Sequence, residues 1–157
     1  MTRLDKLDRQ ILRLLQQDGS IPIQQVADQV GLSVNPCWRR IRRMEAEGVI
    51  QGRVALVDPA KVGLGLTVYV RVKTREHSAA WAKKLNEVIA AMPEIQECHR
   101  IGGDVDYLLK VVVPDMSGYD RSYKELIQRL PALADVSALF SMERLKSVTG
   151  LPIPAES

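Results

Sequence analysis

The apolar residues of this chain change their spacing once, near residue 60, and this change limits the folds that the chain can adopt. Before it, they recur at the spacing of amphipathic helices; after it, TVYVRVKT alternates strictly between apolar and polar side chains, as half-buried strands do. The stretch ALVDPAKVGLGL between them breaks both periods with an Asp-Pro pair and two glycines. We therefore expect a domain at 1–53, a hinge at 54–65, a second domain at 66–150 and a tail at 151–157.

Three helices are predicted in the first domain, and local residues define the ends of the first two. Asp5 and Asp8 suit the start of the first helix, because carboxylates are stabilised at the positive end of a helix dipole, and Gly19 ends it. Pro22 suits the start of the second helix, where its missing N–H is not needed. Gly31 is placed to cap that helix in the left-handed conformation.

The third predicted helix has two chemically different faces. Ser33 is a natural N-cap, and Cys37, Ile41 and Met44 then share one buried face. The opposite face and its flanks carry Asn35, Trp38, Arg39, Arg40, Arg42 and Arg43. The following VIQGRVALV predicts short extended strands, which would form a minimal wing.

This arrangement favours a winged helix-turn-helix that binds DNA. A major groove admits one helix, which must present polar side chains to base edges and positive charges to phosphates. Basic helix faces are often merely solvated, so the arginines alone do not decide the function. Residues 1–53 hold nine Lys+Arg and six Asp+Glu, whereas residues 54–157 hold thirteen of each. Because the whole positive excess lies beside the predicted helix-turn-helix, we interpret the arginine face as a surface for double-stranded DNA.

The second domain shows the order βαββαβ, which is a ferredoxin-like α+β arrangement. The predicted strands span 67–74, 95–101, 106–113 and 135–145, and the predicted helices span 78–92 and 116–130. Their buried sides comprise Trp81, Leu85, Val88, Ile89 and Met92 in one helix, and Tyr119, Tyr123, Leu126, Ile127 and Leu130 in the other. Two helices on one face leave the other face of the sheet uncovered, so we expect a homodimer.

Several classes of function are disfavoured by what the sequence lacks. It has no nucleophile elbow, phosphate loop, dinucleotide fingerprint or zinc pattern, so we expect neither an enzyme nor a cofactor. His77 and His99 have no neighbours at metal-ligand spacing. No apolar run approaches a membrane span, and the acidic residues near the N-terminus argue against an export signal. Two cysteines, Cys37 and Cys98, suit a reducing cytoplasm better than a disulfide framework.

The segment GGDVD at 102–106 has the least ordinary local chemistry in the chain. It lies between two predicted strands, so one interpretation is a hairpin turn in which Gly102 and Gly103 supply positive φ. A turn does not require Asp104 and Asp106, preceded by Arg100. These charges and the glycine N–H groups could instead hold the ammonium and carboxylate groups of a free amino acid. The pattern alone leaves both interpretations open.

Four segments together carry a family resemblance: LDRQILRLLQQDG, GLSVNPCWRRIRRMEAEGVIQG, GGDVDYLLKV with VPDMSGY, and SMERLKSVTGLPI. In these the chain resembles the Lrp/AsnC family, also called feast/famine regulators, over nearly its whole length. The resemblance implies a winged helix-turn-helix joined to a ligand-sensing, ferredoxin-like domain of the RAM or ACT-like type. It also implies dimers that assemble further, often to octamers, and control of genes of amino-acid metabolism.

The resemblance also assigns site residues. It implies that DNA is faced by Ser33, Asn35, Pro36, Trp38, Arg39 and Arg43. It implies an effector pocket where dimers meet, lined on one side by Arg100, Ile101, Gly102, Gly103, Asp104 and Asp106, and on the other by Leu139, Phe140 and Ser141. Trp38 and Arg100 depart from the commonest family form, in which a smaller aliphatic residue is frequent at the first of these positions.

The combination NPCWRRIRR and GRVALVDPAKVGLGL looks most like the branch of the family that senses cysteine and controls its breakdown. We accordingly expect a cytoplasmic, nucleoid-associated protein of a bacterium or archaeon. A hypothesis from another class is an architectural DNA-compacting protein whose second domain only oligomerises. A thermal-shift screen of amino acids separates the two, because one or a few of them should stabilise a sensor.

Overall fold

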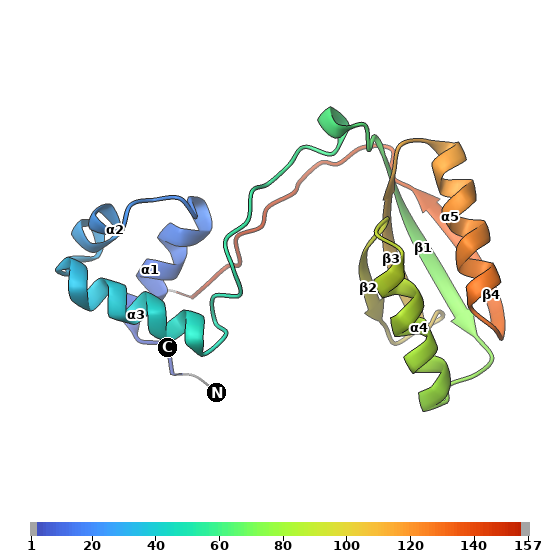
Figure 1. Ribbon diagram of the computed structural model, residues 1–157, viewed down its shortest axis with the longest axis horizontal. Helices are drawn as coiled ribbons and strands as arrows, with labels where there is room; N and C mark the ends of the chain where they lie inside the picture. Colours follow the sequence, from blue (N-terminus) through green and yellow to red (C-terminus); the bar gives the residue numbers. More distant parts are fainter. Residues whose placement is uncertain (1–2, 155–157) are drawn as a thin grey trace. The chain divides into compact units, whose positions relative to one another are not determined.

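The computed structural model describes residues 3–154, which form two compact units (Figure 1). One unit combines the residues up to Leu56 with those from Lys146 onward, and the other runs from Val57 to Leu145. We expected the second domain to extend to residue 150 and a separate tail to follow it, whereas the structure groups the described residues from Lys146 onward with the first unit. No helix among the described residues combines the length and apolar character that crossing a membrane requires.

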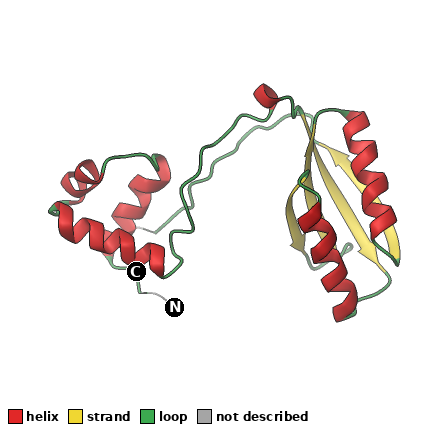
Figure 2. Cartoon of the chain, viewed as in Figure 1, coloured by secondary structure: helices red, strands yellow, loops and turns green. Residues whose placement is uncertain are grey.

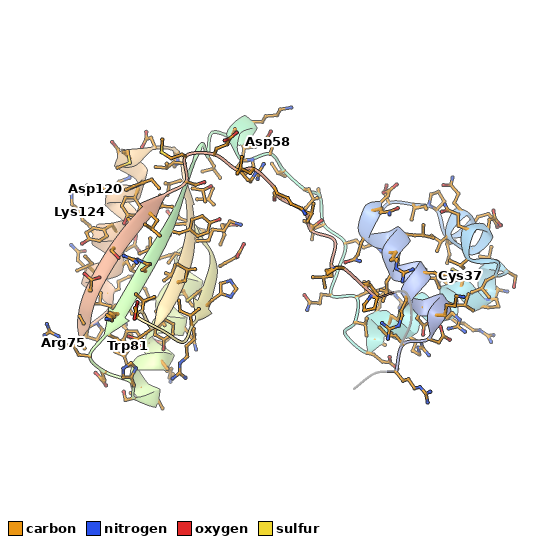
Figure 3. All side chains as sticks on the ribbon, turned by 180° about the vertical axis from the view of Figure 1, so that it is seen from behind. Cys37, Asp58, Arg75, Trp81, Asp120 and Lys124 are labelled. Atoms are coloured by element: carbon orange, nitrogen blue, oxygen red, sulfur yellow. The ribbon has the colours of Figure 1, made fainter. Side chains whose placement is uncertain are left out.

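Three helices pack around a small apolar core in the first unit. They are α1 (Lys6–Gln17), α2 (Ile23–Val30) and α3 (Val34–Ala46). The buried core residues are Ile11, Leu12, Val26, Ala27, Val30, Cys37, Ile41 and Met44. Among them is Cys37, labelled in Figure 3, whose thiol has a pKa raised by burial. The three helices and their buried faces confirm the helical pattern of the sequence.

A reciprocal pair of hydrogen bonds between two aspartates begins α1. The carboxylate of Asp5 accepts from the backbone N–H of Asp8 at 2.8 Å, and the carboxylate of Asp8 accepts from the N–H of Asp5 at 3.1 Å. This capping box satisfies two N–H groups that have no partner within the helix. At the other predicted cap, Gly31 ends α2 with a φ of 71°, as expected for a left-handed residue.

The predicted wing strands are absent from the structure. Residues 49–57 belong to no strand, and the N–H groups of Val49 and Ile50 instead donate to the carbonyl oxygen of Met44 at 2.9 and 3.1 Å. VIQGRVALV has the composition of a strand, but a strand is stable only when a second one pairs with it. No such partner strand exists among residues 3–154 of the first unit, so the prediction of strands was wrong.

The C-terminal segment is held against α1 by side chains of that helix. Gln16 bonds both backbone groups of Leu151, because its Nε2 donates to the carbonyl oxygen at 3.3 Å and its Oε1 accepts from the N–H at 2.6 Å. Arg13 donates to the carbonyl oxygens of Ile153 at 3.3 Å and Pro154 at 2.8 Å. The side chain of Ile153 packs against the core of the three helices. Residues from both ends of the described chain therefore build the first unit.

The second unit is a four-stranded antiparallel sheet with the strand order β2-β3-β1-β4. Its strands are β1 (Leu66–Thr74), β2 (Ile95–Arg100), β3 (Tyr107–Val113) and β4 (Leu133–Phe140), its helices are α4 (Ala79–Ala91) and α5 (Met116–Arg129), and the short η1 (Ala60–Val62) precedes β1. In the central strand, Val70 lies opposite Leu109 of β3 and Ala138 of β4. This arrangement confirms the predicted ferredoxin-like α+β fold.

Both helices cover the same face of the sheet (Figure 2). Val68, Val70 and Val72 of β1 point into this core, as the alternation of TVYVRVKT predicts. Trp81 of α4, labelled in Figure 3, is also buried, and its indole N–H donates to the carbonyl oxygen of Pro131 at 2.7 Å. A buried indole needs such an acceptor, so this bond fixes the loop before β4 to α4.

The buried stripe of α5 differs from the prediction. Gly118 and Ser122 are buried together with Leu126, whereas Ile127 is 39% exposed. A Cβ at Gly118 would lie 3.0 Å from Cδ of Pro114 and 3.3 Å from Cβ of Val113, so a larger residue would have to push the start of α5 or these neighbours away. The glycine side of the helix therefore faces the core, and the prediction that Ile127 is buried was wrong.

The last strand also has different bounds from those predicted. β4 begins at Leu133 and ends at Phe140, whereas the sequence indicated a strand over 135–145. The N–H of Ser141 still donates to the carbonyl oxygen of Thr67 at 3.0 Å, but the residues beyond Ser141 belong to no strand. β1 begins at Leu66, only two residues before the Val68 that pairs with Phe140, so it offers no partner for residues 143–145.

Replacement of Ile153 by Ala should destabilise the first unit by about 1–2 kcal/mol, because it removes partly buried methyl and methylene groups from the helical core. Leu151→Ala is the matched control, since that side chain is 73% exposed and its replacement should change stability by less than about 0.5 kcal/mol. Chemical denaturation followed by circular dichroism measures both. Equal stability of the two variants would show that the C-terminal segment does not contribute to this core.

Candidate functional site

The N-terminal end of α3 presents most of the predicted DNA-facing residues. Exposed positions from Ser33 onward comprise Ser33, Asn35, Pro36, Trp38 and Arg39, and the exposed row continues with Arg42 and Arg43. Ser33 occupies the N-cap position, but its side chain makes no capping hydrogen bond, so its hydroxyl is not used within the helix. The indole of Trp38 is 52% exposed, which is unusual for a large aromatic side chain without a partner.

The four arginines fall into two groups. Arg40 and Arg43 bind carboxylates of α1: Nη1 of Arg40 lies 2.8 Å from Asp8 and 2.6 Å from Asp5, and Nη2 of Arg43 lies 2.5 Å from Asp8. Arg42 makes a surface ion pair within its own helix, at 2.9 Å from Glu45, and no other ion pair among residues 3–154. Arg39 has no hydrogen bond or ion pair with any residue that the structure describes, so its charge is free for a ligand.

The electrostatics of this network follow from its hydrogen bonds. The N–H of Asp8 and the guanidinium of Arg40 lower the pKa of Asp5, and the two aspartates raise the pKa of Arg40. Asp5 and Arg40 therefore both remain ionised at neutral pH. Arg43 is exposed but also contributes to the packing of α3 against α1, because it is one of the partners of the buried Asp8.

Asp8 could have been recognised from its position in α1. It lies three and four residues before Ile11 and Leu12, which puts its carboxylate on the buried stripe of the helix. The sequence interpretation considered only its favourable location near the helix N-terminus. A buried carboxylate needs cationic partners, and the i, i+3 arginines of α3 supply them.

The predicted effector segment is a turn between β2 and β3 that is closed by backbone bonds. The N–H of Ile101 donates to the carbonyl oxygen of Asp106, and the N–H of Asp106 donates to that of Val72, each at 3.0 Å. Gly103 has a φ of 133°, whereas Gly102 does not adopt positive φ, so only one of the two glycines meets the expectation for a turn. The N–H groups of both glycines have no hydrogen-bond partner between residues 3 and 154.

The two aspartates of this turn have different surroundings. Asp106 accepts from the N–H of Thr74 at 2.9 Å, and its other oxygen lies 3.9 Å from Nε2 of His77. Its carboxylate therefore has a structural role at the bulge between Lys73 and Thr74. Asp104 is exposed and makes no such bond within the described part of the chain, so it is the aspartate left to meet a ligand.

The structure does not bring the two predicted sides of the effector pocket together within one chain. The turn after Arg100 extends from β2, and Leu139 and Phe140 belong to β4, which is the opposite edge of the sheet. The two also lie at opposite ends of the strands, because Arg100 pairs with Tyr107 near the end of β1, whereas Phe140 pairs with Val68 near its beginning. A pocket that uses both sets must draw them from different chains.

Comparisons with known proteins identify both units. Residues 4–51 match a winged helix-turn-helix DNA-binding domain, and residues 67–151 match the Lrp/AsnC ligand binding domain. The chain belongs to the Lrp/AsnC family. It is a DNA-binding transcriptional regulator with a ligand-binding domain, and the expected non-enzymatic function is confirmed by its relatives in this family, which are regulators.

Among those Lrp/AsnC relatives is the DNA-binding transcriptional activator DecR of Escherichia coli, 47% identical over 150 residues that cover 96% of this chain and 99% of DecR. The glutamate uptake regulatory protein of Zymomonas mobilis is 49% identical over 155 residues, covering 99% and 94%. Transcriptional regulator NMB0573 of Neisseria meningitidis, in a complex with L-Met, has the same fold at a TM-score of 0.89 and 29% identity, over 96% and 97% of the two chains.

Within this Lrp/AsnC helix-turn-helix, Arg40→Ala should lower the free energy of unfolding by about 1–3 kcal/mol, because the buried Asp8 is then left without one of its charged donors. Arg42→Ala changes the same type of residue on the exposed side of α3 and should alter stability by less than about 0.5 kcal/mol. Urea denaturation of both variants measures the difference. Equal stabilities would contradict a structural role for the Arg40–Asp8 pair.

Proposed function

We propose that this protein is a sequence-specific transcriptional regulator that places α3 in the DNA major groove and responds to a small amino acid, cysteine or one of similar size. The observation that carries the DNA-binding mode is the exposed row at the start of α3, behind which Cys37, Ile41 and Met44 are buried. One face fixes the helix to its unit, and the other offers polar, aromatic and cationic side chains. Its target genes are those of amino-acid metabolism.

The residues of α3 divide the contacts between bases and phosphates. Ser33, Asn35 and Trp38 lie at the N-terminal end, which enters the groove first in a helix-turn-helix. Arg39 supplies a phosphate contact, because it is exposed and unpaired within the described chain. Pro36 contributes apolar contact surface beside them. We place this regulator in the cytoplasm of a bacterium or archaeon, where it acts on DNA.

The ligand-binding unit functions as a dimer that assembles further, to an octamer. Support comes from the sheet face opposite the helices, which has no covering element among the described residues of the second unit. On this face, Tyr69 of β1 and Leu139 of the edge strand β4 are cross-strand neighbours, and they are 38% and 51% exposed. Apolar side chains surrounded by polar ones are typical of a subunit interface. Assembly would also bring the turn after one chain's β2 to the last strand of another.

The turn between β2 and β3 offers complementary groups for a zwitterion. The N–H groups of Gly102 and Gly103, unpaired within the described chain, bind the carboxylate, with Arg100 beside them, and the exposed Asp104 binds the ammonium group. Relatives named for L-Met and for glutamate uptake support an amino acid as the ligand class. The choice of cysteine rests on the resemblance of residues 35–43 and 52–66 to the cysteine-sensing branch.

The DNA-binding mode predicts that Arg39→Ala weakens binding to DNA without changing stability. If Arg39 binds a phosphate, the slope of log affinity against log salt concentration should become shallower by about one for each phosphate that the side chain neutralises. Fluorescence anisotropy over a series of salt concentrations measures this slope. Arg121→Ala, an equal charge change on exposed α5, is the control and should bind as the wild type does. An unchanged slope for Arg39→Ala would contradict the phosphate contact and show that the side chain of Arg39 is merely solvated.

The effector assignment predicts that L-cysteine raises the melting temperature of the wild type and that Asp104→Asn abolishes this rise. Removal of one charge-assisted partner of a desolvated ligand costs about 2–5 kcal/mol, which corresponds to a weakening of about 30-fold or more. L-serine, L-methionine and L-glutamate test the size and charge that the pocket accepts. Glu87→Gln, an equal charge change on the exposed side of α4, is the control and should respond normally.

A reductant is needed throughout this screen, because free cysteine can form a mixed disulfide with a protein thiol. Burial raises the pKa of Cys98, which keeps its thiol largely protonated, and Cys98→Ser removes the more accessible of the two free thiols, since Cys37 is buried. If the rise in melting temperature caused by L-cysteine vanishes in Cys98→Ser, that rise reflects covalent modification rather than effector binding. If no amino acid stabilises the wild type, the second unit serves only for assembly, and the protein compacts DNA rather than sensing a metabolite.

A further inference from the structure

We propose that Asp8 is a positioning residue for DNA recognition, and that it holds the guanidinium of Arg43 ready to read a base. The proposal rests on the proposed binding of α3 in the major groove. The proposal about Asp8 goes beyond that binding mode, because it assigns sequence selectivity to a residue of α1 that does not itself contact DNA. The ion pairs of Asp8 with Arg40 and Arg43 are the observation behind it.

Asp8 is a carboxylate with a full set of donors and almost no exposure to solvent. Its side chain is 1% exposed, its Oδ1 accepts from Arg40, and its Oδ2 accepts from Arg43 and from the N–H of Asp5. A buried carboxylate without such partners is strongly unfavourable, so both arginines are held in place by its requirement for them. The orientation of their side chains is thus set by α1 before any DNA is bound.

Arg43 remains accessible although it is held. Its side chain is 44% exposed, compared with 26% for Arg40, so the guanidinium lies partly at the surface of α3. A guanidinium has five N–H donors in a rigid fork, and a carboxylate on one side leaves the others available. A fork held in one orientation loses little conformational entropy when it binds a flat acceptor pair such as O6 and N7 of guanine.

The charges of the network favour a base contact over a phosphate contact for Arg43. Asp5 and Asp8 supply two negative charges to the two positive charges of Arg40 and Arg43, so the cluster has little net attraction for phosphate. The guanidinium N–H groups of Arg43 that Asp8 does not use remain available as directional donors to a base. Arg39 differs, because no described residue compensates its charge or holds its side chain. This suits a contact with phosphate, which carries no sequence information. The arginines of α3 are therefore divided between affinity and selectivity.

Asp8→Asn tests the role directly. The amide can still accept a hydrogen bond through its oxygen, but it presents an N–H₂ group to the second arginine, so one guanidinium is released. The probe is a DNA duplex selected by the wild-type protein from a pool of random sequences, together with a scrambled duplex of equal length. We expect the ratio of the two affinities to fall about tenfold, the contribution of one bidentate base contact. Binding to the scrambled duplex should stay equal or strengthen, and its salt dependence should become steeper.

A purely structural role gives a different result. If Asp8 only stabilises the fold, Asp8→Asn should weaken binding to both duplexes in parallel, and this would overturn the proposal. Because Asp8→Asn could fail to fold, Arg43→Lys provides a second test. Lysine keeps the positive charge beside Asp8 but lacks the planar fork, so discrimination should fall while stability is retained. Full discrimination by Arg43→Lys would equally overturn the proposal.

Asp28→Asn is the matched control. Asp28 is an exposed carboxylate of α2 that accepts from Gln24 and lies outside the arginine network, so this equal charge change should leave discrimination as in the wild type. Repeating the selection with Asp8→Asn should give a binding motif that has lost its preference at one position of each half-site. A wild type that selects no motif would overturn the proposed sequence-specific function itself. A motif that Asp8→Asn selects unchanged would overturn only the positioning role.

Discussion

The pairing of β1 with both of its neighbours governs what the second unit can do. β1 is the only strand in the described sheet that contacts both β3 and β4, and it separates the edge strands β2 and β4. The two groups of residues assigned to an effector pocket consequently fall at opposite corners of the sheet. With both helices on one face, the other face is available for a second chain. In the function that we propose, sensing and assembly therefore both depend on this strand order, and each needs a second copy of the chain.

A buried carboxylate has a comparable influence on the first unit. Apolar packing alone would allow α3 to rotate about its axis, because Cys37, Ile41 and Met44 define a side of the helix rather than an orientation. The bonds from Arg40 and Arg43 to Asp8 are directional and constrain that rotation. The helix that we propose to enter the DNA groove is thereby oriented by ion pairs with α1.

Most of the fold could be predicted from the sequence, because the spacing of apolar residues reports directly on local structure. The failures occur where the deciding contact is distant in sequence or depends on the absence of a side chain. Gly118 rotates the buried stripe of α5 toward Pro114, and hydropathy does not register a missing Cβ. The strands expected after α3 lack a partner strand among the described residues. The roles of Asp8 and Asp106 were missed for a related reason, since each carboxylate satisfies donors from another element. The exposure of the α3 face was predictable because its periodicity is local.

The return of the C-terminal segment to α1 has a consequence for the synthesis of the protein. Residues 3–56 leave the ribosome about 90 residues before the segment that Arg13 and Gln16 bind, an interval of about 5–20 s at ordinary rates of elongation. During that time the helices have formed without Ile153 in their core. A nascent chain therefore carries a DNA-binding unit that is still incompletely stabilised. The DNA-binding unit therefore gains its last packing interactions only after the ligand-binding unit has been made.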